Sequence, residues 1–387
     1  WESDTNAYVP LENTDIPNVG SRFYIDPSIT VYQNFFKHTL RSRILRRNIS
    51  YTNNSSTYIT SLLTYNEYQN QYQNDQTTFT SGLTYITLMG RTGSYGGQLN
   101  GKNLSGYAQF DHSAGRWNFS TGARYEYFDL DTVQVGQPVF RGGVNYEIAK
   151  GWNIRSSYGQ GFRFPTITEL YMQGEIGPIN LYNNPKLSPE SGWTAELGLK
   201  KVFKIDHFKG YFDVVGFLME YDNMMEFTFG QWGPFSDPMS GIGFSSMNVG
   251  QTRIYGYEFT LNGDGNIGEK WGFGILSGLT VSNPVSVDPD YVFATNYHNS
   301  VSYNFTTTSS NPVTYDLEGV SWLINKIWPI LNKEIPSSEL HTVIGIPITS
   351  NILKYRSRAS ARLDIEAKYD NKISLGFSYQ YNSKMMN

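Results

Sequence analysis

Apolar and polar side chains alternate along residues 117–128, which have the sequence Trp-Asn-Phe-Ser-Thr-Gly-Ala-Arg-Tyr-Glu-Tyr-Phe. One face of an extended chain would carry mainly apolar side chains: Trp117, Phe119, Ala123, Tyr125 and Tyr127. The opposite face would carry small, polar and charged ones: Asn118, Ser120, Gly122, Arg124 and Glu126. Because successive side chains of a strand point to opposite faces, the pattern predicts a strand with one apolar and one charged face.

A tryptophan directly follows a short predicted turn at three places in the chain: Trp117, Trp152 and Trp271. Amphipathic indole rings collect where lipid meets water, so the repeated position predicts a transmembrane β-barrel with these three residues at the membrane interface. A soluble β-sandwich with insertions would explain the alternation, but it would not explain tryptophan at a fixed height beside successive turns.

The same patterning predicts about fourteen antiparallel strands. They lie near 21–33, 38–51, 56–69, 77–89, 102–112, 117–128, 137–148, 152–161, 193–204, 210–222, 249–262, 271–282, 354–368 and 372–383. From residue 102 onward short connections alternate with long ones, which is typical of outer-membrane barrels with short turns on one side and longer loops on the other. The longest predicted extracellular loop, 283–353, contains an apolar segment around Trp322 and Trp328 that predicts a short amphipathic helix. This loop would either pack on itself or cover a ligand or bind a partner.

The polar faces of two predicted strands are strongly charged. The arginines of 38–51 are Arg41, Arg43, Arg46 and Arg47, of which the adjacent Arg46 and Arg47 break the alternation and leave the register open at that point. One face of 354–368 carries Arg356, Arg358, Arg362, Asp364 and Glu366. An arginine at the lipid midplane costs about 2–4 kcal/mol. We therefore expect these side chains to face a wide interior that is hydrated or packed against another polar body.

Composition narrows the class of protein further. Aromatic residues make up 16% and charged residues 17% of the 387 residues, and cysteine is absent. No apolar run reaches the 18 residues that a membrane-spanning helix needs. The net charge of −4 has no basic run to attract nucleic acid. We predict no enzymatic activity, no metal site and no cofactor, because the five histidines form no spaced pair and the acidic pairs Asp129/Asp131 and Asp288/Asp290 are better explained as solvated loop charge.

Two motifs indicate a family. Residues 158–171 read Tyr-Gly-Gln-Gly-Phe-Arg-Phe-Pro-Thr-Ile-Thr-Glu-Leu-Tyr, and residues 184–190 read Asn-Pro-Lys-Leu-Ser-Pro-Glu. Further segments follow at suitable distances: 107–110, 122–126, 221–225 and 248–258. The ordered set, over roughly 77–383, resembles the barrel of TonB-dependent outer-membrane receptors, in the form found in Bacteroidetes-type bacteria.

The resemblance implies a 22-stranded barrel in the bacterial outer membrane, surrounded by outer-membrane lipid, with an N-terminal plug that the TonB complex moves. About fourteen strands over residues 1–387, with no plug sequence and no final aromatic-ended strand, lead us to expect a partial barrel that lacks the plug and the C-terminal strands. Haem is disfavoured as a ligand because the interval 166–183, where haem receptors of this family place a histidine, contains none.

Two groups of residues are candidate functional positions. The barrel-rim motif comprises Arg163, Pro165, Glu169, Asn184, Pro185 and Glu190, in which Arg163 and Glu169 would pair with each other or with the plug, or would only shape the loop base. Ligand binding would use aromatic and amide side chains of the loops: Tyr171, Tyr182, Asn183, Phe229, Gln231, Trp232 and Phe235.

Two hypotheses of function follow. The first is active import of a bulky nutrient, either a siderophore-type metal chelate, a vitamin, a peptide or a glycan, with this small-molecule ligand and the TonB complex as partners. The alternative is a barrel that transports nothing and acts as a scaffold for a surface lipoprotein or other complex subunits. A passive porin is a weaker alternative, because porins have fewer strands and lack the motifs at 162–190.

Overall fold

The computed structural model describes residues 18–51, 58–131, 133–176, 179–234, 236–237, 241–287, 292–298, 301–306, 357–370 and 372–384. The chain forms two compact units, which are described separately. Unit 1 comprises Trp1–Ala108, Arg124–Pro138 and Thr166–Gly174, and unit 2 comprises Gln109–Ala123, Val139–Pro165 and Glu175–Asn387.

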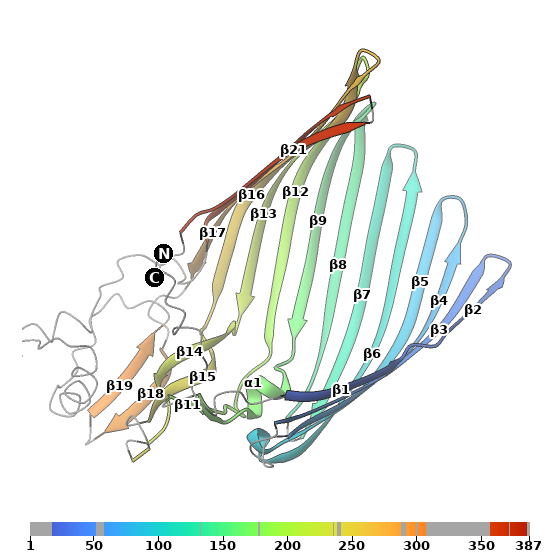
Figure 1. The fold of residues 1–387 in the computed structure, drawn as a ribbon. Coiled ribbons are helices and arrows are strands. Elements are labelled where there is room, and N and C mark those ends of the chain that lie inside the picture. Colours follow the sequence, from blue (N-terminus) through green and yellow to red (C-terminus); the bar gives the residue numbers. More distant parts are fainter. Residues whose placement is uncertain are drawn as a thin grey trace, which may run out of the picture. The chain divides into compact units, whose positions relative to one another are not determined.

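Long antiparallel strands dominate both units (Figure 1). Unit 1 holds five whole strands: β1 (Asn18–Ile25), β2 (Ser28–Gln33), β3 (Phe36–Tyr51), β4 (Tyr58–Gln73) and β5 (Thr77–Thr92). It also holds the first part of β6 (Gly97–Ala114) and the second part of β7 (Trp117–Leu130), whose other parts belong to unit 2. β8 (Val133–Ala149) continues into unit 2, which also holds β9 (Trp152–Arg163), β12 (Glu190–Ile205), β13 (Phe208–Asp222), β16 (Thr252–Ile267), β17 (Trp271–Ser286), β20 (Ala359–Tyr369) and β21 (Ile373–Asn382). These strands form one 15-stranded sheet in the order β1-β3-β4-β5-β6-β7-β8-β9-β12-β13-β16-β17-β20-β21, with β2 beside β3.

The fourteen strands of this path correspond to the fourteen predicted ones, so the prediction of an antiparallel β-sheet is confirmed. Predicted strand 21–33 is divided into β1 and β2 at Asp26 and Pro27. The division has a simple cause, because proline has no N–H to donate to the β-ladder. Of predicted strand 354–368, residues 354–356 lie outside the described part of the chain.

The predicted long connection 129–136 is wrong, because β7 continues to Leu130 and β8 begins at Val133. The long connections after β9, β13 and β17 leave the sheet close to where the sequence predicted, and they contain short elements that it did not predict. β10 (Gly174–Ile176) and β11 (Ile179–Tyr182) follow β9, β14 (Met225–Gln231) and β15 (Ile242–Asn248) follow β13, and the hairpin β18 (Val292–His298) and β19 (Val301–Thr306) follows β17. Unit 1 adds η2 (Gly93–Tyr95) and α1 (Ile167–Tyr171). The predicted helix around Trp322 and Trp328 lies outside the described residues.

The exposure of side chains on the strands is the reverse of that in a soluble protein. On β7, Tyr125 is 52% and Tyr127 36% exposed. The alternate residues Arg124 and Glu126 are half-buried and form an ion pair with each other. Apolar side chains therefore face outward and charged ones inward along this strand, which is the arrangement of a sheet that faces lipid.

In the described residues no helix is long and apolar enough to cross a membrane.

Charged side chains of unit 1 form a network on the inward face. The carboxylate of Glu67 on β4 is 8% exposed and accepts hydrogen bonds from Arg41 Nη1 (2.9 Å) and Tyr107 Oη (2.7 Å). The residues come from β3, β4 and β6. The predicted inward position of Arg41 therefore has a structural reason, since a buried charge needs a partner.

Unit 2 has a matching pair. Arg155 on β9 makes two parallel hydrogen bonds to Asp213 on β13, of 2.8 and 2.9 Å, across the intervening strand β12. β12 has Gly198 at this point, where a Cβ atom would lie 2.9 Å from Arg155 Cζ. The glycine leaves the space that the arginine side chain needs to cross the strand.

Candidate functional site

The two loops that carry the predicted ligand residues combine into a second, four-stranded sheet. Its order is β10-β11-β15-β14, and we call it the loop sheet. β14 and β15 form an antiparallel hairpin with Met225 opposite Asn248, and β15 pairs in parallel with β11, with Asn180 opposite Gly243. The parallel pair joins the loop after β9 to the loop after β13.

Three phenylalanines project from one face of the hairpin, and we call them the aromatic platform: Phe227, Phe229 and Phe244. Phe227 is 61% and Phe229 58% exposed. The ring of Phe244 lies 5.1 Å from that of Phe227, nearly parallel at 8°, and 5.0 Å from that of Phe229 at 59°. Phe229 was predicted from the sequence, whereas Phe227 was missed although its spacing of two residues from Phe229 places both on one face of a strand.

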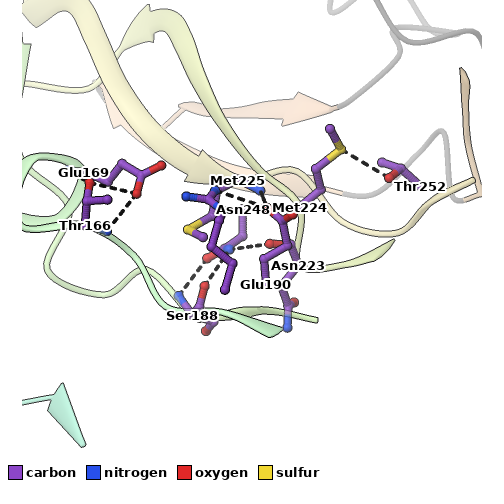
Figure 2. Close-up of polar contacts among 10 residues, drawn as sticks. Thr166, Glu169, Ser188, Glu190, Asn223, Met224, Met225, Asn248 and Thr252 are labelled. Atoms are coloured by element: carbon purple, nitrogen blue, oxygen red, sulfur yellow. Dashed lines mark hydrogen bonds and ion pairs between the residues drawn. The ribbon is translucent and has the colours of Figure 1, made fainter. Parts of the chain in front are cut away.

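The motif at 184–190 fastens one loop to the other. Ser188 N donates to Asn248 Oδ1 (2.9 Å), and Asn248 Nδ2 donates to the carbonyl oxygens of Ser188 (3.0 Å) and Asn223 (2.7 Å), as Figure 2 shows. Asn184 Nδ2 donates to the carbonyl oxygen of Ser246, 2.9 Å away on β15. Asn248 is thus bonded to both loops through one side chain.

Glu190 makes the second link between the two loops. Its Oε2 atom accepts from Arg163 Nη2 (3.2 Å) at the end of β9 and from Met225 N (3.1 Å) at the start of β14. Figure 2 shows Glu190 beside Met225. Leu187 and Met225 are buried, at 3% and 8% exposure, as is Val249 at 2%. Buried apolar side chains and several polar contacts therefore lie at the base of the loop sheet.

The Pro165–Glu169 part of the rim motif begins a short helix. Pro165 is fully buried, and Thr166 and Glu169 form a capping box at the start of α1, in which Glu169 Oε2 accepts from Thr166 N (2.8 Å) and Thr166 Oγ1 accepts from Glu169 N (3.2 Å). The box satisfies amide groups that a helix start leaves without partners. Pairing of Arg163 with Glu169 stays a prediction, because the two residues belong to different units.

Helix α1 is held within unit 1. Leu170 is fully buried, Tyr95 Oη lies 3.1 Å from Thr168 Oγ1, and Gln173 N donates to the carbonyl oxygen of Ser94 at 2.9 Å. Tyr171, a predicted ligand residue, donates a long hydrogen bond of 3.4 Å to Asp131.

The other predicted ligand residues differ in whether their polar groups are hydrogen-bonded within the chain or are exposed. Tyr182 Oη donates to Asp237 Oδ2 and accepts from Asn180 Nδ2, both at 3.1 Å. Burial raises the pKa of the Tyr182 phenol above its ordinary value, Asn180 lowers it and Asp237 raises it. Trp232 donates its indole N–H to the carbonyl oxygen of Thr228 at 3.1 Å. Asn183 is exposed.

Of the predicted ligand residues, Phe235 and the side chain of Gln231 lie outside the described residues. Pro185, a residue of the barrel-rim motif, is exposed next to Asn184. In the described part of the chain no group of three histidine or acidic side chains is arranged to hold a metal ion. The loop sheet therefore offers the aromatic platform as its contact surface, while Tyr182 and Trp232 mainly hold the loop sheet together.

The predicted interfacial tryptophans begin three strands. Trp117 and Trp271 are 43% and 48% exposed at the starts of β7 and β17, and Trp152 begins β9. Each follows a turn whose glycine has a positive φ: Gly115, Gly151 and Gly268. Their contact with the membrane interface stays a prediction.

Comparisons with known proteins identify the family. No curated protein sequence matches the chain. Its fold is similar to those of the FrpB iron transporter of Neisseria meningitidis (12% identity, TM-score 0.58) and the siderophore receptor PirA of Pseudomonas aeruginosa (10%, 0.61). It is also similar to the hemophore receptor HasR of Serratia marcescens, solved as a double mutant with its hemophore HasA and heme (12%, 0.59).

These matches cover 94%, 95% and 95% of this chain and 52%, 56% and 59% of FrpB, PirA and HasR, so the chain spans little more than half of their length. The sequence profile described as "TonB dependent receptor-like, beta-barrel" matches residues 2–383. The chain therefore belongs to the TonB-dependent receptor-like β-barrel family of the bacterial outer membrane, as its motifs predicted.

Proposed function

We propose that this chain is the barrel part of a TonB-dependent importer of a bulky nutrient: a siderophore-type metal chelate, a vitamin, a peptide or a glycan. The loops bind the ligand, and the TonB complex supplies the force for uptake. The protein carries out no covalent chemistry. The proteins of similar fold are named as an iron transporter, a siderophore receptor and a hemophore receptor, which supports a role in uptake.

The observation that carries the proposal is the aromatic platform on the fastened loop sheet. Phe227 and Phe229 expose more than half of their surface in a loop region whose backbone is held by Asn248 and Glu190. A rigid apolar surface loses little conformational freedom when a ligand binds, so more of the contact energy appears as affinity.

The platform also limits the kind of contact. Phenyl rings have no hydrogen-bonding group, so the platform would contact an apolar or flat ring face of the ligand. Hydrogen bonds that distinguish one ligand from another would come from other loop residues, including the exposed Asn183. The platform therefore supports binding of a bulky ligand without naming one of the four classes.

Uptake by the full-length receptor in cells tests the proposal. A strain that depends on this receptor is supplied in turn with ferric chelates, a cobalt-containing vitamin, peptides and glycans as the limiting nutrient, with and without TonB. We expect one class to support growth only when TonB is present. The double variant Phe227→Ala/Phe229→Ala should raise the ligand concentration needed for half-maximal uptake at least about tenfold.

The matched control is Phe377→Ala on β21, which removes a phenyl ring of nearly the same exposure (59%) from a strand of the main sheet. Uptake by this variant should equal that of the native receptor. Growth on none of the four classes, together with stable co-purification of protein partners, would replace the importer by the scaffold alternative.

A further inference from the structure

A group of basic and aromatic side chains lies at the turn-side ends of β7, β9 and β12 in unit 2. We call it the basic-aromatic patch, and its members are Arg116, Trp117, Lys150, Trp152 and Lys201. The patch is on the side of the short turns, so it is separate from the loop sheet.

Lys201 lies on the lipid-facing side of β12. It has the same strand parity as Leu197 and Ile205, which are 59% and 70% exposed. In the β-ladder it stands between Trp152 on β9 and Phe212 on β13. Its ammonium lies 4.8 Å from the centre of the Trp152 ring and donates a long hydrogen bond of 3.4 Å to the carbonyl oxygen of Lys150.

This position requires the ammonium to reach out of the apolar layer. A lysine on a lipid-facing surface extends its apolar stem along the surface and places its charge in the headgroup region. The Val202 N–H donates to the Gly151 carbonyl oxygen at 2.8 Å, which holds the end of β12 against the turn before β9. The direction of the Lys201 side chain is thus toward the turn and the headgroup layer.

Arg116 supplies a second cation close by. Its Nη1 atom donates to the carbonyl oxygen of Ile148 at 3.3 Å, and its own carbonyl accepts from Glu147 N at 2.9 Å. The neighbouring Trp117 ring lies 4.3 Å from that of Tyr146. The carbonyls of Ile148 and Lys150 are two residues apart, at the end of β8 and in the turn that follows it, so the anchor points of the two cations lie within about 7 Å of each other.

In the described part of the chain, the cations of the patch have no acidic partner, unlike three other cations of unit 2. Arg155 pairs with Asp213, Arg253 with Glu220, and Lys372 with Asp370. Among the residues that the structure describes, no carboxylate forms an ion pair with Arg116, Lys150 or Lys201, and the side chains of Arg116 and Lys201 donate to backbone carbonyls. Three positive charges at the edge of a lipid-facing surface are therefore uncompensated.

We infer that the basic-aromatic patch binds the phosphate of an anionic phospholipid headgroup in the membrane leaflet on the turn side. The two cations, whose anchor points lie within about 7 Å of each other at the end of β8 and in the turn after it, would hold a phosphate group between them. The tryptophan rings contact the region where headgroup and acyl chain meet. Phosphatidylglycerol has the required chemistry, with one phosphate and no compensating cation.

Native mass spectrometry of the full receptor in detergent tests the inference. The delipidated protein is titrated with phosphatidylglycerol and, separately, with phosphatidylcholine, whose phosphate carries its own cation. We expect phosphatidylglycerol to bind at lower concentration. The double variant Arg116→Gln/Lys201→Gln should weaken its binding about tenfold or more.

Lys372→Gln is the matched control, because it removes a turn-side lysine that already pairs with Asp370 (2.7 Å). Its phosphatidylglycerol affinity should be unchanged. Should the double variant fail to fold, Lys150→Gln alters only an exposed turn side chain and should still weaken binding.

Three results would overturn the inference. The first is equal binding of the two lipids, and the second is native-level phosphatidylglycerol binding by the folded variants. The third is full competition by inorganic phosphate at millimolar concentration, which would assign the patch to free phosphate instead of lipid.

Discussion

Arg163 and Glu190 stand directly opposite each other in the ladder between β9 and β12, and their side chains form an ion pair of 3.2 Å. This is the last residue pair of the β9–β12 ladder, so it lies where the first long loop leaves the main sheet and returns to it. Because the same Glu190 oxygen accepts the Met225 N–H, this one carboxylate also fixes the start of β14, 35 residues further along the chain.

Removal of this carboxylate should loosen the loop sheet. Glu190→Ala deletes the acceptor for Met225 N–H, and we expect hydrogen exchange across residues 225–231 to become about fivefold faster, the effect of one hydrogen bond. Glu190→Gln keeps an acceptor and should restore much of the protection. Glu366→Ala breaks the Glu366–Lys368 pair on β20 and should leave this exchange unchanged. Equal exchange in the native and Glu190→Ala proteins would show that Glu190 does not hold the hairpin.

The direction of side chains on β12 can be tested with one charge placed at two heights. Leu197→Arg puts a charge near the middle of this strand on its exposed apolar face, which should lower the free energy of unfolding in lipid vesicles by about 2–4 kcal/mol. Ile205→Arg puts the same charge on the same face at the turn, where the loss should be about 0–1 kcal/mol. Both are measured by denaturant titration. Equal losses at the two positions would mean that this face does not cross a lipid layer.

Alanine substitution of two turn glycines, Gly115 and Gly151, should distinguish the cost of backbone strain from the cost of a steric clash. Gly115 has φ of +60° with no other atom near an added Cβ, whereas Gly151 has φ of +74° and an added Cβ would lie 2.8 Å from the Val202 carbonyl oxygen. Gly115→Ala should lower the free energy of unfolding by about 1–2 kcal/mol through the left-handed backbone alone. Gly151→Ala should lower the free energy of unfolding by more than this, because the end of β12 must also move. Urea titrations of both variants give the comparison.

The phenol of Tyr182 provides a test of the loop sheet by pH. Burial and, in smaller part, Asp237 raise its pKa, so its ionisation should occur above the ordinary value of about 10. Because the folded-state pKa is the raised one, the contribution of the neutral phenol to stability is complete below the unfolded pKa and is lost as pH rises through the folded value. NMR of receptor labelled at the tyrosine Cζ atoms, with Tyr182→Phe for assignment, follows this group. A Tyr182 signal that titrates at or below pH 10 would contradict the packing described for β11.

Much of the main sheet could be predicted from local patterning. The alternation along 117–128 gave β7 almost to the residue, because a strand with lipid on one side and polar groups on the other needs opposite side chains at every second position. The motifs at 158–190 predicted the family and the position of a long loop. The alternation did not show that Pro27 divides the first strand.

The loop sheet was beyond local patterning for a physical reason. Its central pair joins β11 to β15 in parallel across about 60 residues, and such a pairing depends on the tertiary structure and not on the sequence of either strand. Phe244 gains its place on the aromatic platform only because β15 lies beside β14. Tyr182 and Trp232 were predicted as ligand residues by their type, yet their polar atoms bond within the chain.

The sequence alone determined the class of fold, the family and the strands of the main sheet, because each depends on short-range periodicity or on contiguous motifs. Only the tertiary structure decided that Glu190 meets Met225, that Asn248 joins two loops, and that Arg116 and Lys201 donate to the nearby carbonyls of Ile148 and Lys150, with no acidic partner among the described residues. These relationships join residues from different strands, and the pairing of strands brings them together.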